Sequence, residues 1–393
     1  MERNFILFDT PVRDLLFPFT HTRPIAACRV GILTIQEKWE KWLGAGISHF
    51  TVQHLQEKFP LHQGTTDTTN ILISGHLLPD EPLVAAIMAL KADEELYHDN
   101  HLIAKVVRGK EVHLLQANAR KNYTGKVLGI HKPWDIFALN DQAIRDDYRL
   151  LTNGRVSEPL PAGNQVINAE QVFIEPGASV QCSVLNAATG PIYIGRDAVI
   201  MEGSLVRGPF AMGERSVLKM GSKVYGATTL GPHCIGGGEI KNVVMFGYSN
   251  KSHEGYLGDA VLGEWCNLGG GTNSSNMKNN ASGVRVWMEA KNEAEVAGLK
   301  CGVLMGDYSR TGIGTNLNTG TVVGVSCNIF GGVMPPKYLP SFSWAQGDMV
   351  SRYRGEEALK DAAAWMKLKG RELTAADAAI LQGLHQRSDR TEL

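Results

Sequence analysis

A six-residue repeat in the second half of the chain is the feature that most constrains its fold. From about residue 170, an aliphatic residue is followed by glycine or a polar residue, two variable positions and a small residue. The repeat is clearest in segments that begin at Ile174, Ile194, Met212, Leu230, Leu257 and Leu262. In a triangular coil each aliphatic residue points inward, and glycine or a small residue takes the tight corner. The repeat therefore predicts a left-handed parallel β-helix over residues 165–345, with on the order of ten coils.

The glycine content agrees with this prediction. The chain has 43 glycines in 393 residues, about 11% against a usual share of ~7%, and most of the excess follows residue 175. A glycine-rich β-sandwich is the alternative architecture, but six matches to one hexapeptide form favour the β-helix.

The flanking segments predict an α/β domain before the repeat and helices after it. In residues 1–155 we expect strands at 4–8 and 70–74, helices near 34–43 and 80–95, and a last helix at 134–151. Prolines and a glycine mark a boundary at 152–168. In the C-terminal segment 350–393, residues 356–369 have a helical composition, and Thr374 begins a second helix as a variant of the capping box.

Composition excludes several classes of partner. The net charge of −1 argues against nucleic acid or an anionic membrane surface. No stretch reaches the roughly 18 apolar residues of a membrane span, and the first residues do not form a signal peptide. Six scattered cysteines without a Cys-x-x-Cys pair indicate small buried residues in a reducing compartment. We therefore expect a cytoplasmic protein that acts on small molecules.

One stretch of the repeat region, residues 247–276, departs from the pattern and carries side chains suited to chemistry. It contains His253, Tyr256 three residues later, several asparagines and a glycine run at 269–271. Acyl transfer to an amine needs a base for the ammonium proton and donors for the tetrahedral oxyanion. Histidine titrates in the range that suits the first task, and the glycine run leaves backbone N–H groups approachable for the second. Taken alone, a single histidine in a coil more often has a structural role. A glycine run can likewise be required only by the tight corner of a coil.

The segment from Lys251 to Asn276 resembles the acetyltransferase domain of the bifunctional glucosamine-1-phosphate N-acetyltransferase / N-acetylglucosamine-1-phosphate uridylyltransferase family. That family has the pattern Lys-Ala-Gly-His-x-x-Tyr-Leu-Gly-Asp, followed by Asn-Ile-Gly-Ala-Gly-Thr. The resemblance implies that His253 is the general base and that Asn276 sits beside the substrate amine. It places the backbone N–H of Gly270, where the family has alanine, at the thioester carbonyl. Tyr256 and Asn267 are then expected to contact the sugar and its phosphate.

Two lysines upstream complete the expected substrate site. Lys241 falls in a Glu-Ile-Lys segment that is similar to the family's Glu-Met-Lys, and Lys223 stands where the family has an arginine for the sugar phosphate. Lysine keeps the charge but loses the bidentate fork of arginine. For either lysine alone, the simpler interpretation is that the side chain lies on a solvated face of the β-helix and has no role in binding. The loop 278–300 is longer than in the family, and which residue of this loop reaches the substrate, among Lys278, Arg285 and Lys291, stays open.

The N-terminal half resembles the nucleotidyltransferase domain of the same family in a shortened, Rossmann-like form. Residues 16–24 are similar to the segment Leu-Pro-Leu-Thr…Lys-Pro of sugar nucleotidyltransferases. The resemblance implies nucleotide binding at residues 9–24, with Arg13, Thr20 and Arg23 as the candidate residues. The glycine-rich phosphate loop is missing after Phe8. The family's domain uses Mg²⁺, which makes this ion a candidate cofactor, with Asn140 at the place of its second metal-side residue. His76 stands where the family has a magnesium-binding aspartate and is a poor ligand for a hard cation.

The resemblance implies an acetyl-CoA-dependent N-acetyltransferase for an amino-sugar phosphate, with glucosamine-1-phosphate the first candidate, in the synthesis of UDP-N-acetylglucosamine or a related sugar nucleotide. It also implies a homotrimer. The alternative is a sugar-1-phosphate nucleotidyltransferase whose β-helix serves assembly or regulation, and a third hypothesis is a non-catalytic sensor or scaffold. The exact acceptor and the length of the acyl chain stay open.

Overall fold

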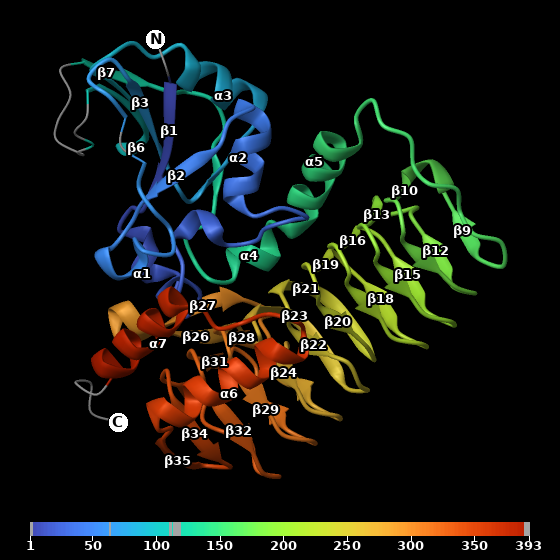
Figure 1. Ribbon diagram of the computed structural model, residues 1–393. Coiled ribbons are helices and arrows are strands. Elements are labelled where there is room, and N and C mark those ends of the chain that lie inside the picture. The colour runs from blue at the N-terminus through green and yellow to red at the C-terminus, as the bar shows by residue number, and fades with distance from the viewer. Residues whose placement is uncertain (1–2, 63, 110–111, 113–118, 389–393) are drawn as a thin grey trace. The chain divides into compact units, whose positions relative to one another are not determined.

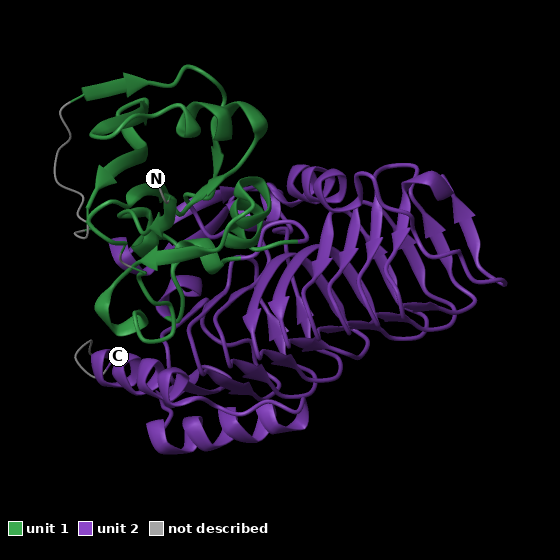
Figure 2. Ribbon diagram, turned by 45° about the horizontal axis from the view of Figure 1, so that its top comes forward, with its two compact units in different colours: residues 1–16, 22–28, 33–131 green, residues 17–21, 29–32, 132–393 purple. Residues whose placement is uncertain are grey.

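The computed structural model describes residues 3–62, 64–109, 112 and 119–388 (Figure 1). It divides into two compact units, which Figure 2 colours separately. Unit 1 comprises residues 1–16, 22–28 and 33–131, and unit 2 comprises residues 17–21, 29–32 and 132–393.

Unit 1 is built on a six-stranded sheet with the strand order β2-β1-β3-β6-β5-β7. Strand β1 runs parallel to β2 and β3, whereas β6 runs antiparallel to β3. The strands are β1 (Arg3–Phe8), β2 (Ile47–Phe50), β3 (Thr69–Ser74), β5 (Glu94–His98), β6 (His101–Arg108) and β7 (Ala119–Asn122). A second, two-stranded sheet pairs β4 (Leu77–Leu78) with β8 (Leu128–Gly129).

The helices of unit 1 follow local sequence signals. They are α1 (Val12–Leu15), α2 (Ile35–Leu43) and α3 (Glu81–Met88), with 3₁₀ turns η2 (Ile25–Ala27) and η3 (Gln53–Leu55). Thr34 and Glu37 form a capping box at the start of α2, and Gly44 ends this helix in the left-handed conformation. The prediction that α3 extends to residue 95 is wrong, because the chain is already extended as β5 from Glu94. The α/β fold class of this region is confirmed.

Unit 2 contains a parallel β-helix in which three columns of short strands form the three sides of each coil (Figure 1). The long strands β21 (Glu239–Gly247) and β23 (Tyr256–Glu264) each run from the first column into the second. The first column contains β9 (Gln165–Ile167), β12 (Val184–Asn186), β15 (Leu205–Arg207), β18 (Lys223–Tyr225), β25 (Asn273–Ser274) and β30 (Asn316–Leu317). The second contains β10 (Val172–Ile174), β13 (Ile192–Ile194), β16 (Phe210–Met212), β19 (Thr228–Leu230), β28 (Leu304–Met305), β31 (Val322–Val323) and β33 (Tyr338–Leu339). The third contains β11 (Ser179–Val180), β14 (Val199–Ile200), β17 (Val217–Leu218), β20 (Ile235–Gly236), β22 (Asn250–Lys251), β24 (Asn267–Leu268), β29 (Arg310–Thr311), β32 (Asn328–Phe330) and β34 (Ser343–Gln346). Strand β35 (Met349–Arg352) extends this sheet by pairing antiparallel with β34.

The repeat places the aliphatic residues as predicted. Ile174, Ile194, Met212 and Leu230 lie in register in the second column, and each is buried. They belong to one hydrophobic core that runs along the inside of the β-helix. The predicted β-helix is therefore confirmed, and its apolar interior accounts for the six-residue spacing.

Helices cover parts of the β-helix. The C-terminal helices α6 (Gly355–Leu368) and α7 (Ala375–Ser388) pack on a corner lined by Trp265, Tyr308 and Phe342. Thr374 caps α7 by accepting from the Asp377 backbone N–H at 3.1 Å, as the sequence predicts. The helices α4 (Asp135–Ala138) and α5 (Asn140–Thr152) also belong to unit 2, so the compact units divide after His131 rather than near residue 155. The 3₁₀ turn η1 (Phe19–His21) lies in unit 2 as well.

One insertion interrupts the coils. The antiparallel hairpin of β26 (Val284–Met288) and β27 (Glu293–Gly298) lies between β25 and β28 and includes the turn η5 (Glu289–Lys291). The coil resumes at once, because Cys301 N–H donates to Asn276 O at 2.8 Å.

Two further features bear on the expected location. Over the part of the chain that the structure describes, no helix is long and apolar enough to cross a membrane. All six cysteines are free thiols, and five are buried. The expectation of six buried cysteines is wrong for Cys182, which is exposed.

Candidate functional site

His253 lies at the corner between the third and the first column of the β-helix. It follows β22, which ends at Lys251, and precedes β23, which begins at Tyr256. The side chain is exposed. On the next coil, the same corner is made by Gly270, and a Cβ built on Gly270 would lie 3.7 Å from His253 Cβ and Cγ. The structure thus brings together the predicted base and the predicted oxyanion donor.

The backbone of the glycine run is anchored on both sides of Gly270. Gly269 N–H donates to Thr311 O at 3.0 Å, and Gly271 N–H donates to Glu254 O at 3.0 Å. Gly270 O accepts from Gly314 N–H at 2.7 Å. The Gly270 N–H itself has no hydrogen-bond partner within the described residues. A fixed, unpaired amide beside an imidazole can stabilise a developing oxyanion.

Tyr256 and Asn276 meet on the first column, next to this corner. Asn276 Nδ2 donates to the Tyr256 hydroxyl oxygen at 3.0 Å and also to Asp259 Oδ2. The other oxygen of Asp259 accepts from Asn242 Nδ2 at 2.8 Å. Because a carboxylate can only accept, the amide nitrogen of Asn276 must face Asp259. The carbonyl oxygen of Asn276 is then the atom of this amide left to accept from a ligand.

The environment keeps the Tyr256 hydroxyl protonated. Burial, followed by the neighbouring Asp259 carboxylate, raises the pKa of Tyr256 to about 12. Its oxygen accepts from Asn276, so its proton is directed to another acceptor. Tyr256 can therefore donate a hydrogen bond to a ligand over the whole physiological pH range.

The two lysines predicted to bind phosphate, Lys223 and Lys241, lie on the same face in earlier coils. Glu239 is in register with Tyr256 on one side and with Lys223 on the other. Tyr225 donates its hydroxyl proton to Glu239 Oε1 at 2.5 Å, and Lys241 Nζ lies 5.7 Å from the centre of the Tyr225 ring. Lys223, Lys241, Tyr256 and Asn276 therefore share one outer side of the β-helix.

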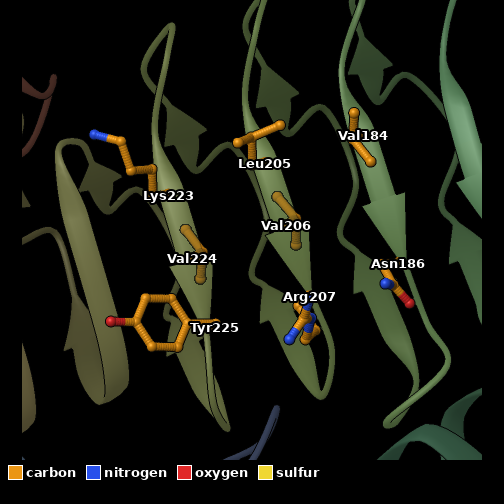
Figure 3. A pocket seen from close by; sticks show the side chains of 8 residues that line it. All are labelled: Val184, Asn186, Leu205, Val206, Arg207, Lys223, Val224 and Tyr225. Carbon is orange, nitrogen blue, oxygen red and sulfur yellow. The ribbon is translucent and has the colours of Figure 1, made fainter.

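A groove opens on this side of the β-helix over β12, β15 and β18 (Figure 3). Lys223 and Tyr225 line its part on β18, and Arg207 lines its part on β15. Arg207 adds a positive charge that the sequence did not single out. It lies in register with Asn186, one coil earlier, and a hexapeptide pattern gives no signal for such an outward residue.

Asn267 lies on a different side from these residues. It is in the third column, in register with Asn250 and Arg310, and it accepts from Asn250 Nδ2 at 3.3 Å. Helix α6 lies over this row, since Arg310 Nη2 donates to Asp361 O at 3.3 Å. The role of Asn267 toward sugar or phosphate stays a prediction.

Two of the three candidate cations in loop 278–300 form contacts within the inserted hairpin. Arg285 Nη2 donates to Ala294 O at 2.8 Å, and Lys291 Nζ pairs with Glu295 Oε1 at 2.6 Å. Lys278 precedes the hairpin, and its charge contributes to lowering the pKa of Lys337, after burial of Lys337 as the main cause. Of the three, Lys278 is the side chain without an intramolecular partner among the described residues, and which of them reaches a substrate stays a prediction.

In unit 1, the carboxyl ends of β1 and β3 bring Asp9, Thr10 and His76 together. Asp9 Oδ1 accepts from Ile25 N–H at 2.9 Å, and Asp9 Oδ2 accepts from the Thr51 hydroxyl. Arg13 Nε lies 3.6 Å from the same carboxylate and Arg13 Nη1 donates to Asp14 at 2.7 Å. His76 Nδ1 lies 3.4 Å from Thr10 Oγ1.

These residues do not fit a magnesium ion. Mg²⁺ requires oxygen ligands in octahedral geometry, whereas both oxygens of Asp9 accept hydrogen bonds from the chain. His76 is buried, and burial, then the charges of His131 and His101, lowers its pKa to about 3. Within the described residues, no three His, Cys, Asp or Glu side chains form a group that could hold a metal. The expected Mg²⁺ site is therefore not supplied by this part of unit 1.

The remaining predicted residues are placed as follows. Arg13 and Arg23 are buried in unit 1, whereas Thr20 is buried in unit 2. Asn140 is fully buried at the start of α5, where its side chain accepts from Gly31 N–H and donates to Ala227 O, each at 2.8 Å. These contacts are structural, and the nucleotide-side and metal-side roles of the four residues stay predictions.

Comparison with known proteins adds to this geometry. Residues 5–156 match the family model of sugar nucleotidyl transferases. The bifunctional protein GlmU of Methanocaldococcus jannaschii is 27% identical over 270 residues, which cover 66% of this chain and 56% of that protein. The bifunctional sugar-1-phosphate nucleotidylyltransferase/acetyltransferase of Sulfurisphaera tokodaii is 26% identical over 278 residues, which cover 68% and 62%. The chain thus matches less than two thirds of the length of these relatives.

Among solved structures, the Arabidopsis UDP-N-acetylglucosamine acyltransferase is 15% identical with a TM-score of 0.26, and the match covers 60% of this chain and 98% of that chain. The chain is thus similar in sequence to bifunctional sugar-1-phosphate nucleotidylyltransferase/acetyltransferases, and its residues 5–156 to sugar nucleotidyl transferases, in agreement with the resemblance described above.

Proposed function

We propose that unit 2 transfers an acetyl group from acetyl-CoA to the amine of an amino-sugar phosphate, with glucosamine-1-phosphate as the first candidate. The contact between His253 and Gly270 is the observation that carries this proposal. It puts a titratable base beside an unpaired backbone N–H on one exposed corner. That pair is what attack of an amine on a thioester requires.

The proposed reaction proceeds in two stages. The amine nitrogen attacks the thioester carbonyl carbon and forms the new C–N bond, while His253 takes a proton from the nitrogen. The Gly270 N–H stabilises the resulting oxyanion. The intermediate then collapses, the C–S bond breaks, and the departing thiolate takes the proton back from the His253 imidazolium. Protons and electron pairs balance without a metal or a redox partner.

The neighbouring side chains suit an amino-sugar phosphate. The contact with Asp259 leaves the carbonyl oxygen of Asn276 to accept a hydrogen bond from the N–H of the substrate amine. Tyr256 offers a hydroxyl donor to the sugar, and Lys241 and Lys223 offer positive charge to its phosphate. Binding of acetyl-CoA, assembly as a homotrimer and a cytoplasmic location are parts of the same proposal.

The direct test supplies acetyl-CoA labelled with ¹³C at the carbonyl and follows the product by NMR. Glucosamine-1-phosphate, glucosamine-6-phosphate and glucosamine serve as parallel acceptors. We expect an amide carbonyl signal with the 1-phosphate and at least a tenfold slower reaction with unphosphorylated glucosamine. Equal rates with all three would contradict the phosphate role of the two lysines. Sedimentation analysis of the same sample tests the trimer.

A second candidate activity belongs to unit 1, because residues 5–156 match the sugar nucleotidyl transferases. This alternative predicts pyrophosphate release from UTP in the presence of a sugar-1-phosphate and a divalent cation. Since Asp9 and His76 do not fit Mg²⁺, we expect no pyrophosphate release above background, and we expect unit 1 to act at most as a nucleotide-binding module.

A further inference from the structure

Lys251 occupies a position that elsewhere in the β-helix is apolar and faces the interior. It is in register with Gly236 on the preceding coil and takes the place that Leu218 and Leu268 have in the same column. Both leucines belong to the interior core. Lys251 is only 2% exposed and is among the largest fully buried side chains of the molecule.

The ammonium group of this lysine reaches the inside of the corner that carries His253. Lys251 Nζ donates to His253 O at 2.6 Å and to Gly237 O at 3.1 Å. Gly237 forms the same corner one coil earlier. The two corner segments are tightly stacked, because a Cβ on Gly237 would lie 2.4 Å from Ser252 O. One side chain therefore ties the backbone of the His253 corner to the coil below.

The coil above holds the same corner from the other side. Gly271 N–H donates to Glu254 O at 3.0 Å, and the Gly270 backbone lies against the His253 side chain. His253 itself is exposed, and its imidazole has no hydrogen-bond partner among the residues that the structure describes. Its position is set through the backbone, and the bond from Lys251 acts on the carbonyl of that very residue.

Burying an amine here is costly, and a leucine would fill the space. Burial lowers the pKa of Lys251 to about 8, which reflects the unfavourable transfer of an ammonium group into an apolar interior. Replacing buried charges by apolar side chains of similar volume is often neutral or stabilising. Stability alone therefore favours an apolar residue at this position.

We propose that Lys251 is a positioning residue, which holds the His253 corner from inside the β-helix so that the His253 side chain stays beside Gly270. This inference rests on the acetyl transfer proposed above. The neighbouring interior positions at Leu218 and Leu268 show that the fold accepts an apolar side chain in this column.

The test compares Lys251→Met with the wild type in steady-state acetyl transfer from acetyl-CoA to glucosamine-1-phosphate. We expect kcat to fall at least tenfold, while the KM values for both substrates change less than threefold. Lys251→Leu, which introduces the residue found at 218 and 268, should behave in the same way and covers the case in which the methionine variant folds poorly. The matched control is Lys369→Met, because Lys369 is another partly buried lysine that donates to a corner carbonyl, His233 O at 2.6 Å. Its kcat should stay within twofold of the wild type.

A double variant separates positioning from a general structural effect. If Lys251 acts through His253, then Lys251→Met should cause no further loss of kcat in a His253→Ala background. A wild-type kcat in both Lys251 variants, or losses that multiply in the double variant, would overturn the inference. If His253→Ala alone keeps full activity, the proposed function fails instead, and the two failures are thus distinguished.

Discussion

Asn276 Nδ2 lies 3.0 Å from the Tyr256 hydroxyl oxygen and donates to it while also donating to the Asp259 carboxylate. Both N–H bonds of the amide are thereby used within the protein. The carbonyl oxygen of Asn276 can therefore accept a hydrogen bond from a ligand, and the hydroxyl group of Tyr256 can donate one. The pair therefore presents one hydrogen-bond acceptor and one donor side by side to a ligand.

Asp259→Ala should remove the group that fixes the orientation of Asn276. A hydrogen bond to a charged group contributes about 1.5–3 kcal/mol, so we expect kcat/KM for the amino sugar to fall roughly 10- to 100-fold, with the KM for acetyl-CoA unchanged. Steady-state kinetics measures this, with Asp141→Ala, on the surface of α5, as control. An unchanged kcat/KM in Asp259→Ala would show that Asn276 does not need this partner.

Lys241→Met should weaken binding of the phosphate and leave the donor site intact. Loss of one charge-assisted contact predicts an increase in the KM for glucosamine-1-phosphate of about tenfold or more, and the KM for unphosphorylated glucosamine should not change. Lys360→Met on α6, which is exposed and pairs with Glu357 at 3.1 Å, is the control. Equal increases in KM for both sugars would contradict a phosphate contact.

Substitutions in the glycine run separate backbone conformation from chemistry. A Cβ at Gly270 would make ordinary contacts of 3.7 Å with His253, so Gly270→Ala should keep activity within about threefold. Gly271 has a φ of 71°, and alanine in that conformation costs roughly 1–2 kcal/mol. Urea denaturation should therefore show a loss of stability for Gly271→Ala and almost none for Gly270→Ala. A large loss of stability in the Gly270 variant would show that the corner has less room than the structure indicates.

The stability of the protein should depend on pH through Lys251. In the folded chain burial lowers its pKa to about 8 from the ordinary value of 10.5. Between these values the unfolded chain binds more protons than the folded chain, so this group makes stability rise with pH in that window. Below pH 8 both states are protonated, and the full cost of burying the ammonium group is present.

We therefore expect the free energy of unfolding of the wild type, relative to Lys251→Met, to increase between pH 7 and pH 9.5. Urea titrations of both proteins at the two pH values measure this difference. A difference that stays constant or falls over the interval would contradict a depressed pKa at this position.

The β-helix could be predicted because each coil repeats one rule: an inward aliphatic residue and a small corner residue. The same rule contains the signal that would have identified Lys251, since a lysine stands in an inward column between Gly236 and Leu268. Residues 247–256 depart from the six-residue pattern, which obscures this signal. Asp259 has no comparable signal in the sequence, because its contact with Asn276 joins two coils 17 residues apart.

Other features depend on contacts that a single sequence does not reveal. The grouping of α4 and α5 with the β-helix follows from tertiary packing rather than from the proline-containing boundary at 152–168. Asn267 aligns in sequence with the sugar site but lies in the third column, because the corner at 269–271 turns the chain between it and the face that carries Tyr256. A linear motif shows which residues are present and leaves open which side of the coil each occupies.

The most direct measurement is thiol release from acetyl-CoA in the presence of glucosamine-1-phosphate, for the wild type and for His253→Ala. Since a general base contributes typically 10²- to 10⁴-fold and His253 is exposed, the variant should fold normally and lose at least a hundredfold in kcat. We expect release that requires both the sugar phosphate and His253. Release at the wild-type rate in the His253→Ala variant, or no sugar-dependent release by the folded wild-type protein, would contradict it.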